Sequence, residues 1–166
     1  MAKYIANVAG QLTEVSGLAT SAGAGDAGKI PQLDGTGRID NSMMPVGLAA
    51  DTQAITTSEA LAAGDWVNIW NSTGAKARKA DATVAGKEAM GFVLAAVGSG
   101  AVATVYFEGT NTQVAGQTPG RVYLSTTAGT GQTAAPSAAG NVVQVLGFAT
   151  SATTVNFQSG PAIVLA

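Results

Sequence analysis

The strongest constraint on the fold is the alternation of short β-prone runs with turn residues from Ala54 onward. Residues 66–70 alternate bulky and lighter side chains, and the turn sequence Asn-Ser-Thr-Gly follows at 71–74. Apolar residues do not recur there at the spacing of a normal amphipathic helix. Regular short strands separated by Gly, Ser and Thr are typical of β-sandwiches and β-barrels. The sequence therefore predicts an all-β domain.

The same alternation predicts individual strands and their pairing. Residues 66–70 and 75–80 flank the first turn and predict a hairpin. Residues 88–97 and 101–108 are separated by Gly-Ser-Gly and predict a second hairpin. Further strands are expected over 121–125, 142–150, 153–157 and 162–165. The one helical expectation is a short turn over 57–63, with Ser58 as its N-cap.

The first fifty residues have a different composition, which changes near Pro45. They are rich in glycine, contain few large apolar side chains and show no helical period, so they cannot pack a core of their own. Residues 4–15 fit a short strand or helix, and residues 19–28 fit a flexible linker. We expect an extended Gly-rich N-terminal arm over 1–50, followed by a small antiparallel β-barrel or jelly-roll-like sandwich over 51–166.

Composition excludes several classes of function. The chain contains no His and no Cys, which removes disulfides, Cys/His zinc sites, Cys nucleophiles and His general bases. Eight basic residues against ten acidic residues give a net charge of -2 and no basic run, so we expect no nucleic-acid partner. No uncharged apolar stretch is long enough for a membrane helix, and we expect no membrane partner. These exclusions favour a protein that is not an enzyme and has no cofactor.

The apparent chemical motifs fail on inspection. Residues 23–29 match the start of a phosphate-binding loop, but Ile30 stands where a hydroxyl should hold magnesium. Asp34 and Asp40 are the closest acidic pair in this region and are expected to cap turns. A basic cluster is interleaved with acids and favours a solvated strand face with ion pairs: Lys76, Arg78, Lys79 and Lys87, with Asp81 and Glu88.

Charge is nearly absent from the C-terminal part of the chain. After Glu108, Arg121 is the only charged side chain, although exposed strands normally carry charges that prevent unwanted pairing. Either Thr, Ser, Gln and Asn solvate this surface, or copies of the same chain cover it. The second alternative predicts a homo-oligomer.

The aromatic side chains are expected in the core and at its margins: Trp66, Trp70, Phe92, Tyr106, Phe107, Phe148 and Phe157.

Several stretches of the chain resemble a known family. They are SAGAGDAGKIPQLDGTGRIDNSMMPVG, GDWVNIWN, KARKADATVAGKEAMGFVLAAV, ATVYFEGTN, GRVYLSTTAGT and NVVQVLGFATSATTVNF. Together they resemble the capsid decoration, or cement, proteins of tailed bacteriophages. The resemblance implies a barrel or jelly roll without catalysis that binds the outer capsid, usually as a trimer or dimer. Its expected partners are the major capsid protein and further copies of itself.

The resemblance also leaves alternatives open. The AGKI…GRID…MMP segment is similar to one that precedes β domains in phage fibre proteins, so a tail-fibre or baseplate module is the alternative within the virion. A carbohydrate-binding β-sandwich is the alternative from another class. A decoration protein would be made in the bacterial host cytoplasm and lie on the outer capsid surface. Its expected contacts with capsid or neighbouring protomers are Lys29, Ile30, Arg38, Ile39, Asp40, Met43 and Met44.

Overall fold

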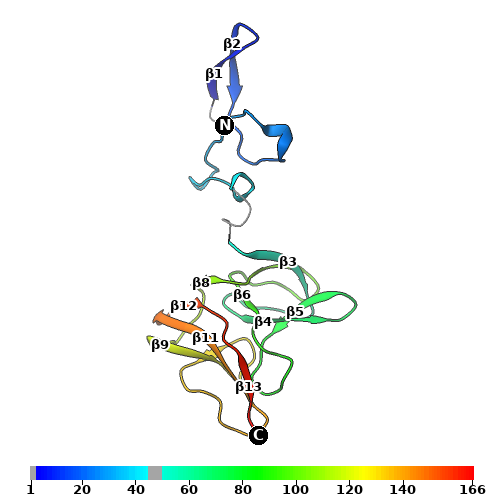
Figure 1. The fold of residues 1–166 in the computed structure, drawn as a ribbon, viewed down its shortest axis with the longest axis vertical. Coiled ribbons are helices and arrows are strands. Elements are labelled where there is room, and N and C mark those ends of the chain that lie inside the picture. The colour runs from blue at the N-terminus through cyan, green and yellow to red at the C-terminus, as the bar shows by residue number, and fades with distance from the viewer. Residues whose placement is uncertain (1–2, 45–49) are drawn as a thin grey trace. The chain divides into compact units, whose positions relative to one another are not determined.

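The computed structural model describes residues 3–44 and 50–166. It divides the chain into two compact units, Met1–Ala49 and Ala50–Ala166, which we call the N-terminal unit and the β domain (Figure 1). The expected change of composition at Pro45 lies outside the described residues. Strands dominate the regular structure of both units, which confirms the all-β prediction.

The N-terminal unit begins with a β-hairpin. Strands β1 (Lys3–Val8) and β2 (Gln11–Ser16) pair antiparallel from Lys3 opposite Ser16 to Val8 opposite Gln11. The two connecting residues, Ala9 and Gly10, both have positive φ, as tight two-residue hairpin turns require. Two short 3-10 helices follow, η1 (Ala24–Asp26) and η2 (Asn41–Met43). Of the two alternatives for residues 4–15, the strand is correct.

Five strands of the β domain close into a barrel. In the order in which they pair, they are β3 (Thr52–Thr57), β5 (Ala75–Lys79), β4 (Trp66–Asn71), β6 (Gly91–Val93) and β7 (Val102–Tyr106). Both predicted hairpins are present, as β4–β5 and β6–β7. The barrel is not wholly antiparallel, because β3 and β5 pair in parallel. Strand β3 was not expected from the sequence.

The remaining six strands form a second sheet. Its order is β10–β9–β11–β12–β8, with β13 also paired to β11. The strands are β8 (Gly109–Asn111), β9 (Gly120–Leu124), β10 (Gly131–Gln132), β11 (Val142–Ser151), β12 (Thr154–Phe157) and β13 (Ala162–Val164). The four strands predicted after residue 120 are therefore confirmed, whereas the short strands β8 and β10 were missed.

The helical turn expected over 57–63 is wrong. Thr57 is the last residue of β3, and its N–H donates to the Ala101 carbonyl at 2.8 Å. The next N–H, of Ser58, donates to the Ala77 carbonyl at 2.8 Å. The backbone N–H groups of residues 57 and 58 are thus hydrogen-bonded to neighbouring barrel segments and not within a helix. The Ser58 hydroxyl caps no helix and instead accepts from the Trp70 indole N–H at 3.2 Å.

Strands β4 and β6 contribute to two cores at once. Their side chains alternate, so Val67 and Val93 point into the barrel, whereas Trp66 and Phe92 pack in a core shared with the second sheet. The barrel core also contains Ile55, Leu61, Ala77, Ala103 and Val105. The shared core adds buried residues of the second sheet: Val122, Leu124, Leu146, Ala149, Val155 and Phe157. The barrel and the second sheet are therefore packed as one domain.

Aromatic contacts hold the shared core. The Trp66 ring lies 5.7 Å from Phe92 and 5.2 Å from Phe157, and Phe92 stacks on Tyr106 at 5.4 Å between centroids. Trp66, Phe92 and Phe157 are buried, as the sequence predicted. Phe148 is not a core residue, because 48% of it is exposed.

At Gly147, strand β11 approaches its neighbour β12 too closely for a side chain, which yields a test of the fold. It has φ +137°, and a Cβ there would lie 1.9 Å from the Asn156 carbonyl oxygen. Gly120 has a similar φ of +131° but open space around it. We expect Gly147→Ala to lower the free energy of unfolding by at least roughly 4 kcal/mol, and Gly120→Ala by only about 1–3 kcal/mol. Urea denaturation measures both; equal losses would show that the close approach is wrong.

Candidate functional site

The N-terminal unit exposes apolar side chains and buries none of its described residues. Every residue from 3 to 44 is exposed or only partly buried. In this range, the exposed large apolar side chains are Ile5, Val8, Leu12, Ile30, Leu33, Ile39 and Met44. A segment that keeps its apolar side chains at the surface without a core of its own has the composition of a docking element.

The β1–β2 hairpin has one face without charge. Register places Tyr4 opposite Val15 and Val8 opposite Gln11 on this face. The other face carries the ion pair between Lys3 and Glu14. A hairpin of two strands is marginally stable by itself in water. Tyr4 and Val15 on the uncharged face are partly buried, whereas Ile5 and Leu12 lie exposed on the face with the ion pair.

The predicted contact residues come from consecutive turns of the unit. Ile30 and Ile39 are each 50% exposed, and Met44 is 40% exposed. Lys29 and Arg38 are also exposed, whereas Asp40 and Met43 are partly buried. The sequence analysis did not predict four further exposed apolar residues: Ile5, Val8, Leu12 and Leu33. A large apolar side chain in a segment without a core of its own was the signal that could have identified them.

Aspartate carboxylates shape the turns that carry these residues. Asp34 accepts hydrogen bonds from the Arg38 N–H at 3.0 Å and from the Thr36 hydroxyl at 2.7 Å. Asp40 is the N-cap of η2 and accepts from the hydroxyl and the N–H of Ser42, at 2.6 and 2.9 Å. The prediction that both acids cap turns is confirmed. These hydrogen bonds, first from Arg38 and from Ser42 respectively, lower the pKa of both carboxyls.

Asp26 organises the turn that resembled a phosphate-binding loop. Its carboxylate accepts from the Lys29 ammonium at 2.6 Å and from the Ala22 N–H at 2.6 Å. The hydrogen bond from Lys29, followed by that from Ala22, lowers the pKa of Asp26. The lysine that would contact a phosphate is therefore paired with a carboxylate of the same turn.

Backbone hydrogen bonds tie these turns to one another. The N–H of Leu18 donates to the Ile30 carbonyl at 2.9 Å, and that of Gln32 donates back to the Leu18 carbonyl at 2.8 Å. The Ser21 N–H donates to the Ser42 hydroxyl oxygen at 2.8 Å. Polar contacts thus fix the backbone of the unit while its apolar side chains stay exposed.

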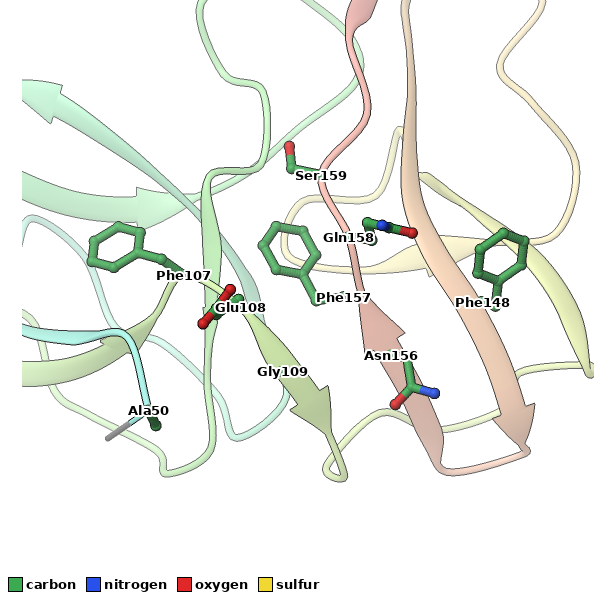
Figure 2. A pocket seen from close by; sticks show the side chains of 9 residues that line it. All are labelled: Ala50, Phe107, Glu108, Gly109, Phe148, Asn156, Phe157, Gln158 and Ser159. Atoms are coloured by element: carbon green, nitrogen blue, oxygen red, sulfur yellow. The ribbon is translucent and has the colours of Figure 1, made fainter. Parts of the chain in front are cut away.

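The β domain carries a separate hollow where β8 and β12 diverge. The two strands pair as far as Gly109 opposite Phe157, and a hollow of about 630 Å³ opens beyond this pair. Figure 2 shows the Phe107, Phe157 and Phe148 side chains along it, with the polar side chains of Glu108, Asn156 and Gln158.

The basic cluster of the barrel is engaged in local contacts. Lys79 lies 3.5 Å from Asp65, and Lys87 lies 3.9 Å from Asp81. The Arg78 guanidinium donates to Asn68 at 2.9 Å and lies 4.7 Å from the centre of the Trp70 ring. The Lys87–Asp81 pair confirms part of the expected arrangement, whereas Lys79 pairs with the buried Asp65, which the sequence did not single out.

Within residues 3–44 and 50–166, no three acidic side chains meet in a geometry that would hold a metal ion. The same ranges contain no helix long and apolar enough to cross a membrane. A cavity of about 220 Å³ in the β domain is lined by Trp66 and Gln117, and the buried indole N–H and Gln117 Oε1 form no hydrogen bond with the protein. Exposed Gln113, Ala115 and Thr130 also line it, so it opens to the surface, and its polar lining suits bound water.

The chain was compared with protein-family models, curated proteins and solved structures, and no match was found. The candidate sites described above therefore rest on the sequence and on the geometry of this chain alone.

The aspartates make the N-terminal unit testable by pH titration. We expect carboxyl NMR to give Asp26, Asp34 and Asp40 midpoints below 3.8, their ordinary pKa, and Asp65 a higher one because burial raises its pKa. A lowered pKa means that ionisation stabilises the turns above pH 3.8, and that this is lost as pH falls through the folded pKa. Midpoints at or above 3.8 for the first three residues would contradict the turn geometry.

Proposed function

We propose that this protein is a capsid decoration protein of a tailed bacteriophage, which binds the outer capsid surface through its N-terminal unit. The observation that carries the proposal is that no described residue from 3 to 44 is buried, while seven large apolar side chains there are exposed. Such a unit gains its missing core when it lies on another protein surface. We propose the capsid as that surface because stretches of the sequence resemble phage decoration proteins.

The energetics suit a contact that is repeated many times. Burial of a whole large apolar side chain stabilises by about 1.5–3 kcal/mol, so Ile30, Ile39 and Met44, which are about half exposed, can each contribute roughly 1 kcal/mol. Three such contacts give only modest affinity for one arm. Several linked arms of one oligomer would bind much more tightly through avidity. This requirement supports a homo-oligomer, which we propose is a trimer.

The β domain is the stably folded part of the proposed decoration protein. Its barrel is closed, so the five barrel strands leave no free edge for uncontrolled pairing. The surface after Glu108 carries Arg121 as its only charged side chain, which lets neighbouring copies approach without repulsion. In this proposal, residues 1–50 are the arm that lies on the capsid and the β domain stands outside the shell.

The affinity of full-length variants for capsids that lack the protein tests the proposal. We expect the triple substitution Ile30→Ser, Ile39→Ser and Met44→Ser to weaken binding at least about 100-fold, because roughly 3 kcal/mol of apolar burial is lost in each arm. A matched control replaces three exposed apolar residues of the β domain: Val84→Ser, Met90→Ser and Val102→Ser. The control is expected to bind normally. Equal binding by both variants would mean that the arm is not the contact.

The number of copies per virion distinguishes a capsid protein from a tail protein. A decoration protein is present in roughly hundreds of copies per virion, whereas a fibre or baseplate module is present in a few tens at most, as the symmetry of each structure dictates. Quantitative mass spectrometry of purified virions measures this number. A count in the tens would replace the decoration function with the tail-fibre or baseplate alternative.

Capsid binding is also expected to resist salt. The charged residues of the described N-terminal unit are nearly balanced, and Lys3–Glu14 and Lys29–Asp26 form ion pairs within it. Screening of surface charges therefore removes little of the binding energy. We expect less than about a threefold change in affinity between 0.05 and 0.5 M NaCl, measured by co-sedimentation with capsids. A loss of tenfold or more would assign the contact to electrostatic attraction.

A further inference from the structure

We propose that the β domain binds a neutral oligosaccharide along the trough that passes Phe148. The trough consists of the hollow in Figure 2 and two neighbouring hollows of about 420 and 620 Å³. Phe148 lines all three, and Gln158 lines the first two. They are therefore contiguous on one side of the second sheet.

Strand register explains why these side chains share a face. Phe148 on β11 lies directly opposite Arg121 on β9 and directly opposite Asn156 on β12. Asn156 in turn lies opposite Thr110 on β8. Side chains at directly opposite positions project from the same face of a sheet. Because neighbouring strands are about 4.8 Å apart, this row spans roughly 14 Å, which suits a chain of sugars better than a single sugar.

Aromatic rings on the trough offer surfaces for the apolar faces of sugar rings. Phe148 is 48% exposed, and partly buried Phe107 and Tyr123 line its two ends. Ring faces of this kind stack on C–H groups, and they bury apolar area with little loss of side-chain entropy. Phe148 lies opposite Arg121, and Tyr123 is two residues from Arg121 on β9, so these two rings share the exposed face of the sheet. Phe107 instead packs against the barrel core at one end of the trough.

Polar side chains beside these rings match sugar hydroxyls. The side chains of Glu108 and Gln158 are exposed. Neither the Glu108 carboxylate nor the Gln158 side-chain amide forms a hydrogen bond or ion pair within the described residues. Asn156 uses its Oδ1 to accept from the Thr110 hydroxyl at 2.7 Å, which leaves its N–H groups toward solvent. A carboxylate and amides together supply the acceptors and donors that neighbouring hydroxyl groups need.

Charge and composition favour a neutral glycan over a protein on this face. Of the described residues that line the trough, only Glu108 and Arg121 are charged, and their formal charges cancel. Among the lining residues that the structure describes, Phe148 is the only strongly exposed large apolar side chain. The core of a protein interface needs several such residues and few free carboxylates.

The test measures binding of the full-length protein to an array of neutral oligosaccharides. The array contains α- and β-linked hexose chains, N-acetylhexosamine chains and neutral O-antigen repeat units. We expect the protein to bind at least one of them. Phe148→Ala is expected to weaken that binding roughly tenfold, because a stacking surface is lost. Glu108→Gln, which removes an acceptor without changing shape, is expected to weaken it severalfold.

Ile163→Ala is the matched control, because Ile163 is 61% exposed on β13 and lines none of the three hollows. It is expected to bind like the unaltered protein. Absence of binding across the array, or equal binding by Phe148→Ala, would overturn the inference. A changed oligomeric mass of Phe148→Ala in light scattering would also overturn it, because the trough would then be a contact between copies. Capsid binding by the same variants reports separately on the decoration function.

Discussion

The packing of Trp66 against Phe92 and Phe157 is the contact on which the β domain depends. Trp66 and Phe92 belong to barrel strands, whereas Phe157 belongs to the second sheet, so this cluster joins the two. The backbone reinforces it, because the Trp66 N–H donates to the Gly129 carbonyl at 2.9 Å and the Trp66 carbonyl accepts from the Ala80 N–H at 2.8 Å. A barrel of five short strands encloses few side chains, and the sheet supplies the additional buried area that a stable domain needs.

The N-terminal unit is held together by different interactions. It orders its backbone with carboxylate caps at Asp26, Asp34 and Asp40 and keeps its large apolar side chains exposed. Turns held in this way have a defined local shape without the stability that a core provides. A unit of this kind is suited to lie on another surface, where the partner supplies the apolar burial that the unit lacks. This contrast with the β domain is the physical reason for proposing that the N-terminal unit binds the capsid and that the β domain is the stably folded part of the protein.

The two proposed activities use different parts of the chain and are therefore separable. Capsid binding is assigned to the exposed apolar residues between Ile30 and Met44, and oligosaccharide binding to the trough beside Phe148. The near absence of charge after Glu108 suits both close packing of copies and contact with a neutral glycan.

The sequence by itself determined the elements whose causes are local. Turn residues at 71–74 and 98–100 predicted both barrel hairpins, and the preference of aspartate for turns predicted the caps at Asp34 and Asp40. Tertiary structure alone decided the strand ending at Thr57, because its hydrogen-bond partners lie at Ala77 and Ala101. It also decided that Phe148 faces solvent beside Arg121 and Asn156, since that depends on the register of three strands. Alternation within one strand gives two faces, and only packing against the barrel chooses which of them is buried.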